Sequence, residues 1–223
     1  MRLVMLGPLG VGKGTQGRRL AVACGCALIS TGEILREAVA RATPLGLEAR
    51  RQMDSGRLVD DEVMIGLVRE RTGEPDAQDG FVLDGFPRTV PQAEALDALL
   101  AERGHRIDAV LALSVSEDEL VRRLQGRREC PVCKRAYNAE GAAARDGRHC
   151  DDHPAAELRM RADDAEEAVR QRFAEYRAKT APLMDYYTAT GRLRRVTGSG
   201  TVDAVFEALR REAGCGSQAP QTA

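Results

Sequence analysis

The stretch Gly7-Pro8-Leu9-Gly10-Val11-Gly12-Lys13-Gly14-Thr15 lies directly after a short apolar segment near the amino terminus. It has the form G-x-x-x-x-G-K-[ST], in which glycines let the backbone turn sharply and direct its N–H groups at phosphate oxygens. The apolar residues 2–6 before it are typical of a buried strand, and residues 16–23 after it of a helix. In this context Lys13 is expected to reach the β- and γ-phosphates, and the Thr15 hydroxyl to bind Mg²⁺. The sequence therefore predicts a phosphate loop that binds a nucleoside polyphosphate.

Further apolar segments with strand character follow, separated by stretches of helical periodicity, at residues 27–29, 81–83, 109–113 and 193–196. This alternation predicts an α/β fold, a parallel sheet with helices on both faces. Helices are expected from Pro91 toward Arg103, after Ser116, and over residues 163–187. Two segments depart from the alternation: residues 31–72 look helical throughout, and residues 128–160 have little periodicity.

Composition limits the partners of the chain. Its 223 residues carry a net charge of -1, which provides no bulk attraction to nucleic acid or to a membrane surface. No apolar run approaches the 18 residues of a membrane span, and the first apolar segment ends at the glycine loop without a cleavage signal. We therefore expect a cytoplasmic protein with no nucleic-acid or membrane partner.

Two polar motifs follow the second and third predicted strands. Ser30-Thr31-Gly32, taken alone, is best interpreted as a helix N-cap. Asp84-Gly85-Phe86-Pro87-Arg88-Thr89, with Gln92 one helical turn later, places an acid and an arginine at the same carboxyl edge as the glycine loop. Ligands of open α/β sheets bind at that edge. Asp84 is therefore expected to hold Mg²⁺ through water, and Arg88 to bind a second phosphate through two hydrogen bonds.

These motifs, in this order and together with Gly126-Arg127-Arg128, Arg161-Ala162-Asp163-Asp164 and Arg172, closely resemble the adenylate kinase family in its long-lid form. The resemblance covers roughly residues 1–212. It implies reversible phosphoryl transfer from MgATP to AMP, giving two ADP, by a monomer. It also implies a P-loop core with a parallel five-stranded sheet over residues 1–29, 60–125 and 164–212. A helical insertion over residues 30–59 would bind the nucleoside monophosphate, a lid over residues 126–163 would close over ATP, and residues 213–223 would form a disordered tail.

The resemblance carries site residues onto matching positions. For ATP these are Gly10, Val11, Gly12, Lys13, Gly14, Thr15, Arg123, Arg127 and Gly200, with Tyr137 as a residue that stacks on the base. For AMP they are Thr31, Arg36, Arg57, Leu58, Val59, Gly85, Phe86, Pro87, Arg88, Gln92, Arg161 and Arg172. On this match Gln92 reads the adenine edge, and Arg36 with Arg88 holds the α-phosphate. The catalytic group comprises Lys13, Asp84, Arg88, Arg123, Arg161 and Arg172.

Phosphoryl transfer explains why the predicted catalytic residues are mainly cations. The transition state spreads negative charge over three oxygens and requires little covalent work from the protein, so positioned cations with Mg²⁺ carry the catalysis. No general base is needed. Water is the competing acceptor, and closing two flaps over the nucleotides would exclude it.

The predicted lid holds a second motif, Cys130-Pro131-Val132-Cys133, followed after sixteen residues by Cys150-Asp151-Asp152-His153. Two such pairs suit a tetrahedral structural Zn²⁺ with Cys130, Cys133, Cys150 and His153 as ligands. A polar loop without metal and a disulfide are the alternatives, and His149 and Asp152 are alternative fourth ligands. The remaining cysteines, Cys24, Cys26 and Cys215, are expected to be small buried apolar residues or free thiols.

Two other functions compete with adenylate kinase activity. A related kinase would phosphorylate UMP or CMP, but Thr31 and Gln92 match the adenine-reading pattern. A non-catalytic zinc module would bind nucleic acid or protein, but the chain has no basic stripe with interleaved aromatic residues.

Overall fold

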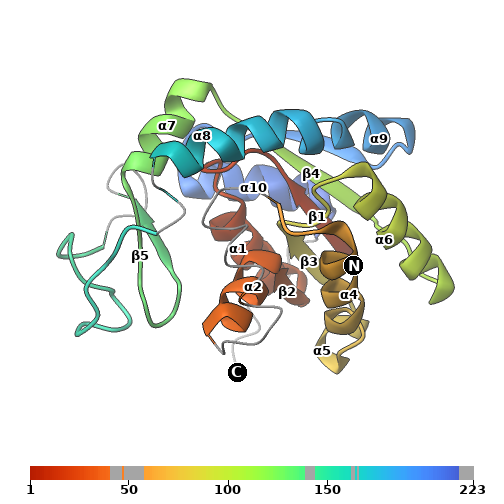
Figure 1. The fold of residues 1–223 in the computed structure, drawn as a ribbon, viewed down its shortest axis with the longest axis horizontal. Coiled ribbons are helices and arrows are strands. Elements are labelled where there is room, and N and C mark those ends of the chain that lie inside the picture. Colours follow the sequence, from red (N-terminus) through yellow and green to blue (C-terminus); the bar gives the residue numbers. More distant parts are fainter. Residues whose placement is uncertain (41–46, 48–57, 139–143, 162–163, 165, 216–223) are drawn as a thin grey trace.

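A parallel sheet with strand order β2-β3-β1-β4-β7 forms the centre of the molecule (Figure 1). The computed structural model describes residues 1–40, 47, 58–138, 144–161, 164 and 166–215. The strands are β1 (Arg2–Leu6), β2 (Ala27–Ser30), β3 (Phe81–Asp84), β4 (Ala109–Ser114) and β7 (Leu193–Thr197). They coincide with the five apolar segments of the sequence. The predicted five-stranded parallel sheet is thus confirmed.

Helices flank this sheet on both sides. They are α1 (Lys13–Cys24), α2 (Thr31–Ala40), α4 (Asp61–Arg71), α5 (Pro75–Gln78), α6 (Val90–Glu102), α7 (Glu117–Gln125), α8 (Glu166–Glu175), α9 (Leu183–Ala189) and α10 (Val202–Ala213). Local capping explains several of their starts. The Ser30 and Ser116 hydroxyls accept hydrogen bonds from the backbone N–H groups of Glu33 and Glu119, as expected for N-caps.

The sheet divides the hydrophobic core into two clusters. Along β1, Val4 and Leu6 belong to the cluster that includes buried residues of α4, α6 and α9, whereas Leu3 and Met5 belong to the one that includes residues of α1, α7 and α10. All four side chains are at most 2% exposed. Successive strand side chains point to opposite faces, and a parallel sheet covered on both faces buries both sets. This explains why the central strands β1, β3 and β4 are nearly continuous apolar runs, whereas the edge strand β7 carries two exposed arginines.

The parallel register brings three loops to one edge of the sheet. Met5 of β1 lies beside Asp84 of β3, and Asp84 lies beside Ser30 of β2. The loops that follow these three strands therefore open at the same carboxyl edge, where the sequence motifs are located.

The long helix expected over residues 163–187 is interrupted. After α8 the chain makes a π-helical turn, η2 (Tyr176–Thr180), and then begins α9. The N–H group of Ala181 donates to the carbonyl of Tyr176, five residues earlier, at 2.8 Å. Pro182, which has no N–H to donate, follows directly, so the regular α-helical ladder cannot continue through this point.

The segment with little periodicity contains a hairpin that the sequence did not reveal. Strands β5 (Arg127–Glu129) and β6 (Ala136–Asn138) pair in antiparallel register. Figure 1 shows this hairpin projecting away from the central sheet. The hairpin lies within the expected lid, residues 126–163, of which residues 139–143 and 162–163 lie outside the described residues.

Two further expectations fall partly outside the described residues. Most of the monophosphate-binding insertion, residues 41–46 and 48–57, is not described, and neither are residues 216–223 of the expected tail. Within the described part of the chain, no helix combines the length and apolarity required to cross a membrane.

Candidate active site

The glycine loop joins β1 to α1 and forms the floor of the site. Gly7, Gly10 and Gly12 have φ values of 141°, 81° and 102°, in the region that favours glycine. At Gly7 a Cβ atom would also lie 2.5 Å from the carbonyl oxygen of Leu113, so a larger residue could not pack there. The Lys13 ammonium crosses the loop and donates to the carbonyl oxygens of Gly7 at 2.7 Å and of Pro8 at 2.8 Å.

Several charges converge on Lys13. Burial lowers the pKa of the Lys13 ammonium to about 8; the Asp84 carboxylate opposes this shift, and Arg88, Arg172 and Arg127 add to it. Asp84 also lies against the start of α1, since a Cβ atom on Gly14 would be 3.4 Å from its Oδ2. The site therefore gathers several cations around Lys13, with the Asp84 carboxylate at its edge.

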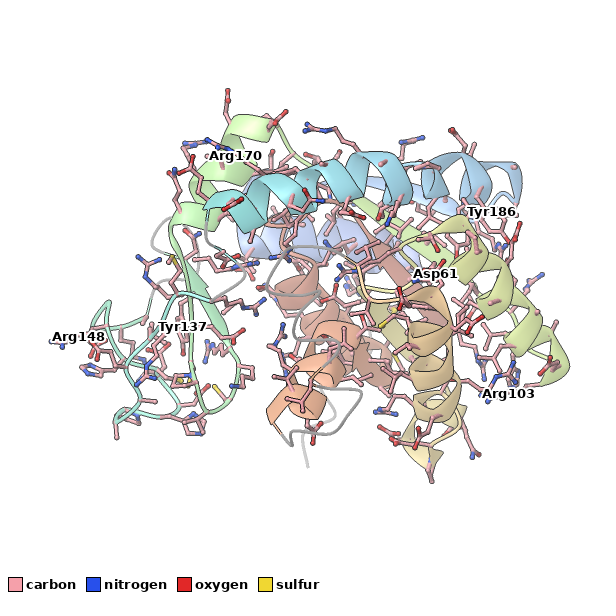
Figure 2. All side chains as sticks on the ribbon, in the orientation of Figure 1. Asp61, Arg103, Tyr137, Arg148, Arg170 and Tyr186 are labelled. Atoms are coloured by element: carbon pink, nitrogen blue, oxygen red, sulfur yellow. A yellow bond between two sulfur atoms is a disulfide. The ribbon has the colours of Figure 1, made fainter. Side chains whose placement is uncertain are left out.

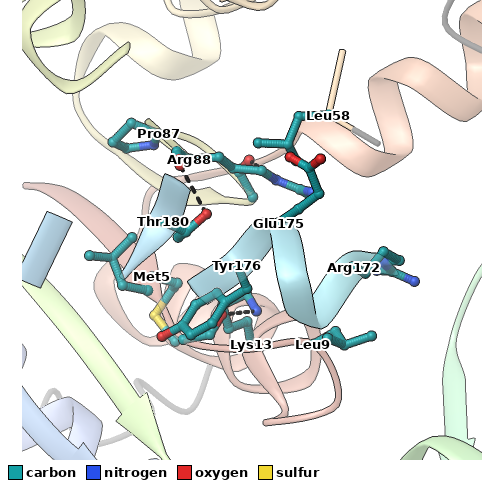
Figure 3. A pocket seen from close by; sticks show the side chains of 13 residues that line it. Met5, Leu9, Lys13, Leu58, Pro87, Arg88, Arg172, Glu175, Tyr176 and Thr180 are labelled. Atoms are coloured by element: carbon teal, nitrogen blue, oxygen red, sulfur yellow. Dashed lines mark hydrogen bonds between the residues drawn. The ribbon is translucent and has the colours of Figure 1, made fainter. Parts of the chain in front are cut away.

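A cleft connects the glycine loop with the loop that follows β3, and Figure 3 shows Lys13, Arg88 and Arg172 among its lining residues. The loop after β3 is held in place from two sides. The Arg88 Nε donates to the carbonyl oxygen of Gly85 at 2.8 Å, and the Arg88 carbonyl accepts from the Thr180 hydroxyl at 2.9 Å. The π-helical turn that carries Thr180 is therefore part of the support of Arg88. Leu58 and Pro87 also line the cleft.

Close backbone approach explains the glycine after Asp84. Gly85 has a φ of 88°, and a Cβ atom there would lie 2.7 Å from the hydroxyl oxygen of Thr31 and 3.3 Å from an Arg88 nitrogen. The Thr31 hydroxyl donates to the Asp84 carbonyl oxygen at 3.4 Å. These contacts bring the predicted monophosphate residues of α2 and of the loop after β3 together.

The remaining residues of the predicted monophosphate site occupy varied environments. Phe86 is 1% exposed and belongs to the hydrophobic core, and Val59 is also buried. Arg36 lies over Gly32, and its buried Nε has no hydrogen-bond partner among the described residues, which leaves a donor for an anion. Arg57 lies outside the described residues.

Gln92 is buried on α6 and is held at both ends of its carboxamide. Its Oε1 accepts from the backbone N–H of Arg88, and its Nε2 donates to Asp61, each at 2.7 Å. Sequence reasoning missed Asp61, which belongs to an acidic run at the start of α4 that is also typical of a solvated helix N-terminus.

Arg123 joins the glycine loop to the loop after β7. It donates to the carbonyl oxygens of Val11 at 3.3 Å and of Gly198 at 2.9 Å, and it forms an ion pair with Glu119. Gly200, two residues after Gly198, is exposed and has a φ of 110°. Arg123 therefore connects two predicted ATP-binding segments, the glycine loop at Val11 and the loop that contains Gly200.

The other predicted arginines, Arg127, Arg161 and Arg172, form ion pairs with carboxylates. Arg127 and Arg172 both approach Asp164, whose side chain is fully buried: Arg127 Nε donates to Asp164 Oδ2 at 2.7 Å, and Arg172 Nη1 lies 3.6 Å from Oδ1. Arg161 pairs instead with Glu129 of the hairpin. Arg172 also lines the cleft, whereas Arg161 is paired within the predicted lid itself. Asp164 and Glu129 had not been singled out as partners from the sequence.

Four side chains in the lid could hold a metal ion. The ligand atoms of Cys130, Cys133, Cys150 and His153 all lie within 4.8 Å of one another. The Cys133 and Cys150 sulfurs are 3.6 Å apart, and Cys150 Sγ is 3.6 Å from His153 Nδ1. Bonds of ~2.3 Å to sulfur and ~2.05 Å to nitrogen in a tetrahedron place such ligand atoms roughly 3.5–3.8 Å apart. The donor set and its spacing therefore fit zinc.

The alternative fourth ligands are engaged elsewhere. His149 Nδ1 bonds to Asp146 at 2.7 Å, and Asp152 forms an ion pair with Arg135 at 2.8 Å. Burial raises the pKa of the Cys150 thiol, but hydrogen bonds with Tyr137 and His153 outweigh it and lower that pKa to about 6.

Tyr137 lies in the small core of the lid. It is 3% exposed, its hydroxyl lies 3.3 Å from Cys150 Sγ, and the same hydroxyl accepts from the Asp151 N–H at 3.0 Å. This corrects the expectation that Tyr137 stacks on the ATP base, because its ring is covered in this arrangement. The sequence around Tyr137 does not indicate which face of strand β6 its ring occupies, nor that this face is buried.

Cys24 and Cys215 form a disulfide, which corrects the expectation of free thiols. Cys24 ends α1 and Cys215 follows α10, and the two helices pack against each other. Their Cα atoms are 5.6 Å apart although the residues are 191 positions apart in sequence. Cys26 is a free thiol whose pKa is raised by burial.

Comparison with known proteins identifies the family of the chain. The sequence profile of the adenylate kinase family matches residues 5–192. The adenylate kinase of Citrifermentans bemidjiense is 51% identical over 205 residues, which cover 92% of this chain and 95% of the relative. That of Thermodesulfovibrio yellowstonii is 48% identical over 209 residues (94% and 97%), and that of Salinispora tropica 49% over 219 residues (96% and 100%). With the phosphate loop and the arginine-lined cleft in place, the chain belongs to the adenylate kinase family.

Proposed function

We propose that this chain transfers the γ-phosphoryl group of MgATP to AMP, reversibly, and forms two ADP. The observation that carries the proposal is the convergence of Lys13, Arg88 and Arg172 in one cleft between the glycine loop and the loop after β3. A nucleotide on each loop would place its phosphates toward the other, as in-line transfer requires. Family membership supports the same reaction.

On the ATP side, the glycine loop, residues 10–15, would bind the phosphates through backbone N–H groups, and Lys13 would bind the terminal ones. The Thr15 hydroxyl would hold Mg²⁺ directly and Asp84 through water; the ion neutralises charge on the transferring group. Arg123, which contacts the carbonyl oxygens of Val11 and Gly198, and Gly200 would contact ATP beside the loop.

On the AMP side, Thr31, Arg57, Leu58 and Val59 would surround the nucleoside, with the loop from Gly85 to Pro87, and Gln92 would read adenine. Arg36 and Arg88 would bind the α-phosphate. The buried unpartnered Nε of Arg36 supports an anion at this position.

The remaining arginines, Arg127, Arg161 and Arg172, would surround the transferring group once the lid closes. In this arrangement the three are paired with Asp164 and Glu129. Closure of the lid (residues 126–163) and of the insertion (residues 30–59) would exclude water and so suppress ATP hydrolysis.

The lid would carry one structural Zn²⁺ on Cys130, Cys133, Cys150 and His153. All four positions would be filled by protein, so no position would remain for water or substrate. We further propose that the enzyme acts as a cytoplasmic monomer, since Lys13, Arg88 and Arg172 all come from one chain.

An acceptor panel tests the proposal against UMP or CMP kinase activity. Purified protein is incubated with MgATP and with AMP, CMP or UMP, and diphosphate formation is followed. AMP is expected to have the highest kcat/KM by at least ~100-fold. Uracil lacks the amino donor and the ring-nitrogen acceptor that Gln92 would read, and cytosine presents that pair on a single ring that is smaller than adenine. Comparable values for CMP or UMP would contradict the proposal.

A dinucleotide that joins two adenosines through five phosphates tests whether the two sites face each other. Filling both sites at once gives the second half a high effective concentration, so it should inhibit far more strongly than either nucleotide alone binds. Binding no tighter than that of ATP would argue against facing sites.

A further inference from the structure

The side chain of Asp61 reaches away from its own helix toward the next one. Asp61 is the first residue of α4, where an acid commonly serves the helix N-terminus. Here both carboxylate oxygens accept from the start of α6: Oδ1 from Gln92 Nε2 at 2.7 Å, and Oδ2 from the Thr89 hydroxyl at 2.8 Å. Figure 2 shows Asp61 between α4 and α6. The Asp61 carboxylate thus positions the Gln92 side chain, in addition to any favourable interaction with the N-terminus of α4.

The two partners of the Gln92 carboxamide fix which way round the group lies. The backbone N–H of Arg88 can only donate, so the atom that faces it must be the oxygen. The Asp61 carboxylate can only accept, so the atom that faces it must be the NH₂ group. A flipped carboxamide would place N–H against N–H and oxygen against carboxylate. Gln92 is 1% exposed, so water could not compensate for that loss.

Within the described part of the chain, the carboxamide so held makes no further hydrogen bond, which leaves one acceptor position on Oε1 and one donor on Nε2. A 6-aminopurine presents the complementary pair, a donor at its amino group and an acceptor at N1. A 6-oxopurine presents the opposite pair, an acceptor at O6 and a donor at N1, and would fit only the flipped carboxamide. The carboxamide lies at the backbone of Arg88, whose side chain lines the cleft.

We propose that Asp61 is a specificity-determining positioning residue: by holding Gln92 in one orientation, it makes the acceptor site select AMP over 6-oxopurine monophosphates such as IMP. This inference rests on the proposed function, in which Gln92 reads the acceptor base. Asp61 itself touches no substrate, and it acts through the orientation of its neighbour.

The substitution Asp61→Asn tests this role. Asparagine keeps the shape of the side chain but can accept or donate, so both orientations of Gln92 become available on that side, while the Arg88 N–H still favours the original one. The ratio of kcat/KM for AMP to kcat/KM for IMP is expected to fall at least ~10-fold, in part because the value for IMP rises. A charge-assisted hydrogen bond is worth about that factor or more.

Asp60→Asn is the matched control. It removes the same charge at the same end of α4, but Asp60 is exposed, and its side chain does not cap the helix. Asp60→Asn should leave the AMP-to-IMP ratio unchanged. A similar fall in both variants would show that the charge at the helix end, and not the contact with Gln92, sets the ratio.

A double-mutant cycle with Gln92→Ala separates positioning from a general structural effect. If Asp61 acts through Gln92, then Asp61→Asn should not change the ratio further once Gln92→Ala is present. An equal change in both backgrounds, or an unchanged ratio in Asp61→Asn alone, would overturn the inference. Failure of the unmodified enzyme to phosphorylate AMP would instead refute the proposed function, so the two failures are distinguishable.

Discussion

Replacing Cys150 by alanine should loosen the lid while leaving the central sheet intact. Cys150 lies at the middle of the proposed zinc site, with Cys133 Sγ and His153 Nδ1 each 3.6 Å from its sulfur. Loss of its thiolate leaves at most three protein ligands, and zinc affinity depends on the complete set. One equivalent of zinc is expected in the unmodified chain and much less in Cys150→Ala.

The size of the effect follows from how little apolar packing the lid has. Among the described residues its cluster holds the buried Cys130, Tyr137, Ala144 and Cys150, and the half-buried Leu158 is its other large apolar side chain. Two large side chains contribute about 3–6 kcal/mol by burial. Binding of a structural zinc ion contributes about 10–16 kcal/mol. A bound zinc ion would therefore stabilise the lid more than its apolar packing does. Its loss should make local opening easier by at least ~4 kcal/mol, or about 1,000-fold.

Amide hydrogen exchange measures this opening directly. The N–H groups of Cys130, Lys134 and Cys150 each form a backbone hydrogen bond of 3.0 Å within the lid and should exchange much faster in the variant. Amides of β1 and β3 should keep their protection. Cys26→Ala, which removes a thiol outside the cluster, should change neither zinc content nor exchange in the lid. Lid amides that remain protected in metal-free Cys150→Ala protein would refute the reasoning.

Three other perturbations test the site and the core. Lys13→Ala and Arg88→Ala should each lower kcat at least ~100-fold, while the circular dichroism spectrum stays normal. A preorganised donor in a water-poor site stabilises the transition state by several kcal/mol. An unchanged kcat would remove that residue from the mechanism. Because the pKa of Lys13 is lowered to about 8 in the free enzyme, kcat/KM for MgATP should fall as the pH rises through that value, and in Lys13→Arg, whose guanidinium stays protonated, this fall should be absent. Reducing the Cys24–Cys215 disulfide should lower the free energy of unfolding by about 2–5 kcal/mol, because the bond joins residues 191 positions apart; an unchanged melting temperature in reductant would contradict this.

The fold was largely predictable because the three central strands, β3, β1 and β4, are buried on both faces. Apolar runs such as residues 81–83 and 109–113 have no other stable place than the middle of a covered sheet. The glycine loop was predictable for a related reason, since its backbone angles and the close approach at Gly7 admit few other residues. Such local requirements appear directly in the residue types.

Features that depend on tertiary neighbours were not predictable in this way. The Cys24–Cys215 bond depends on α1 and α10 packing together, and nothing in the spacing of the six cysteines indicates that contact. The burial of Tyr137 likewise depends on the fold of the hairpin over Cys150. Because these two tertiary contacts could not be foreseen, the expected stacking of Tyr137 on the ATP base and the expected free thiols of Cys24 and Cys215 were wrong.

The arginines of the lid show this limit in electrostatic terms. Their positions are constrained by the phosphates that they are proposed to bind, so they can be recognised even in a chain with 33 basic and 34 acidic residues. Asp164 belongs to the Arg161-Ala162-Asp163-Asp164 motif, but the motif does not indicate that its carboxylate approaches both Arg127 and Arg172. An arginine binds carboxylate and phosphate through the same planar set of donors, so an entering phosphate would replace a carboxylate that already holds the guanidinium in a desolvated position. The cations that phosphoryl transfer needs can therefore be predicted from sequence motifs, whereas the acids that hold them before a nucleotide arrives become evident only in the folded protein.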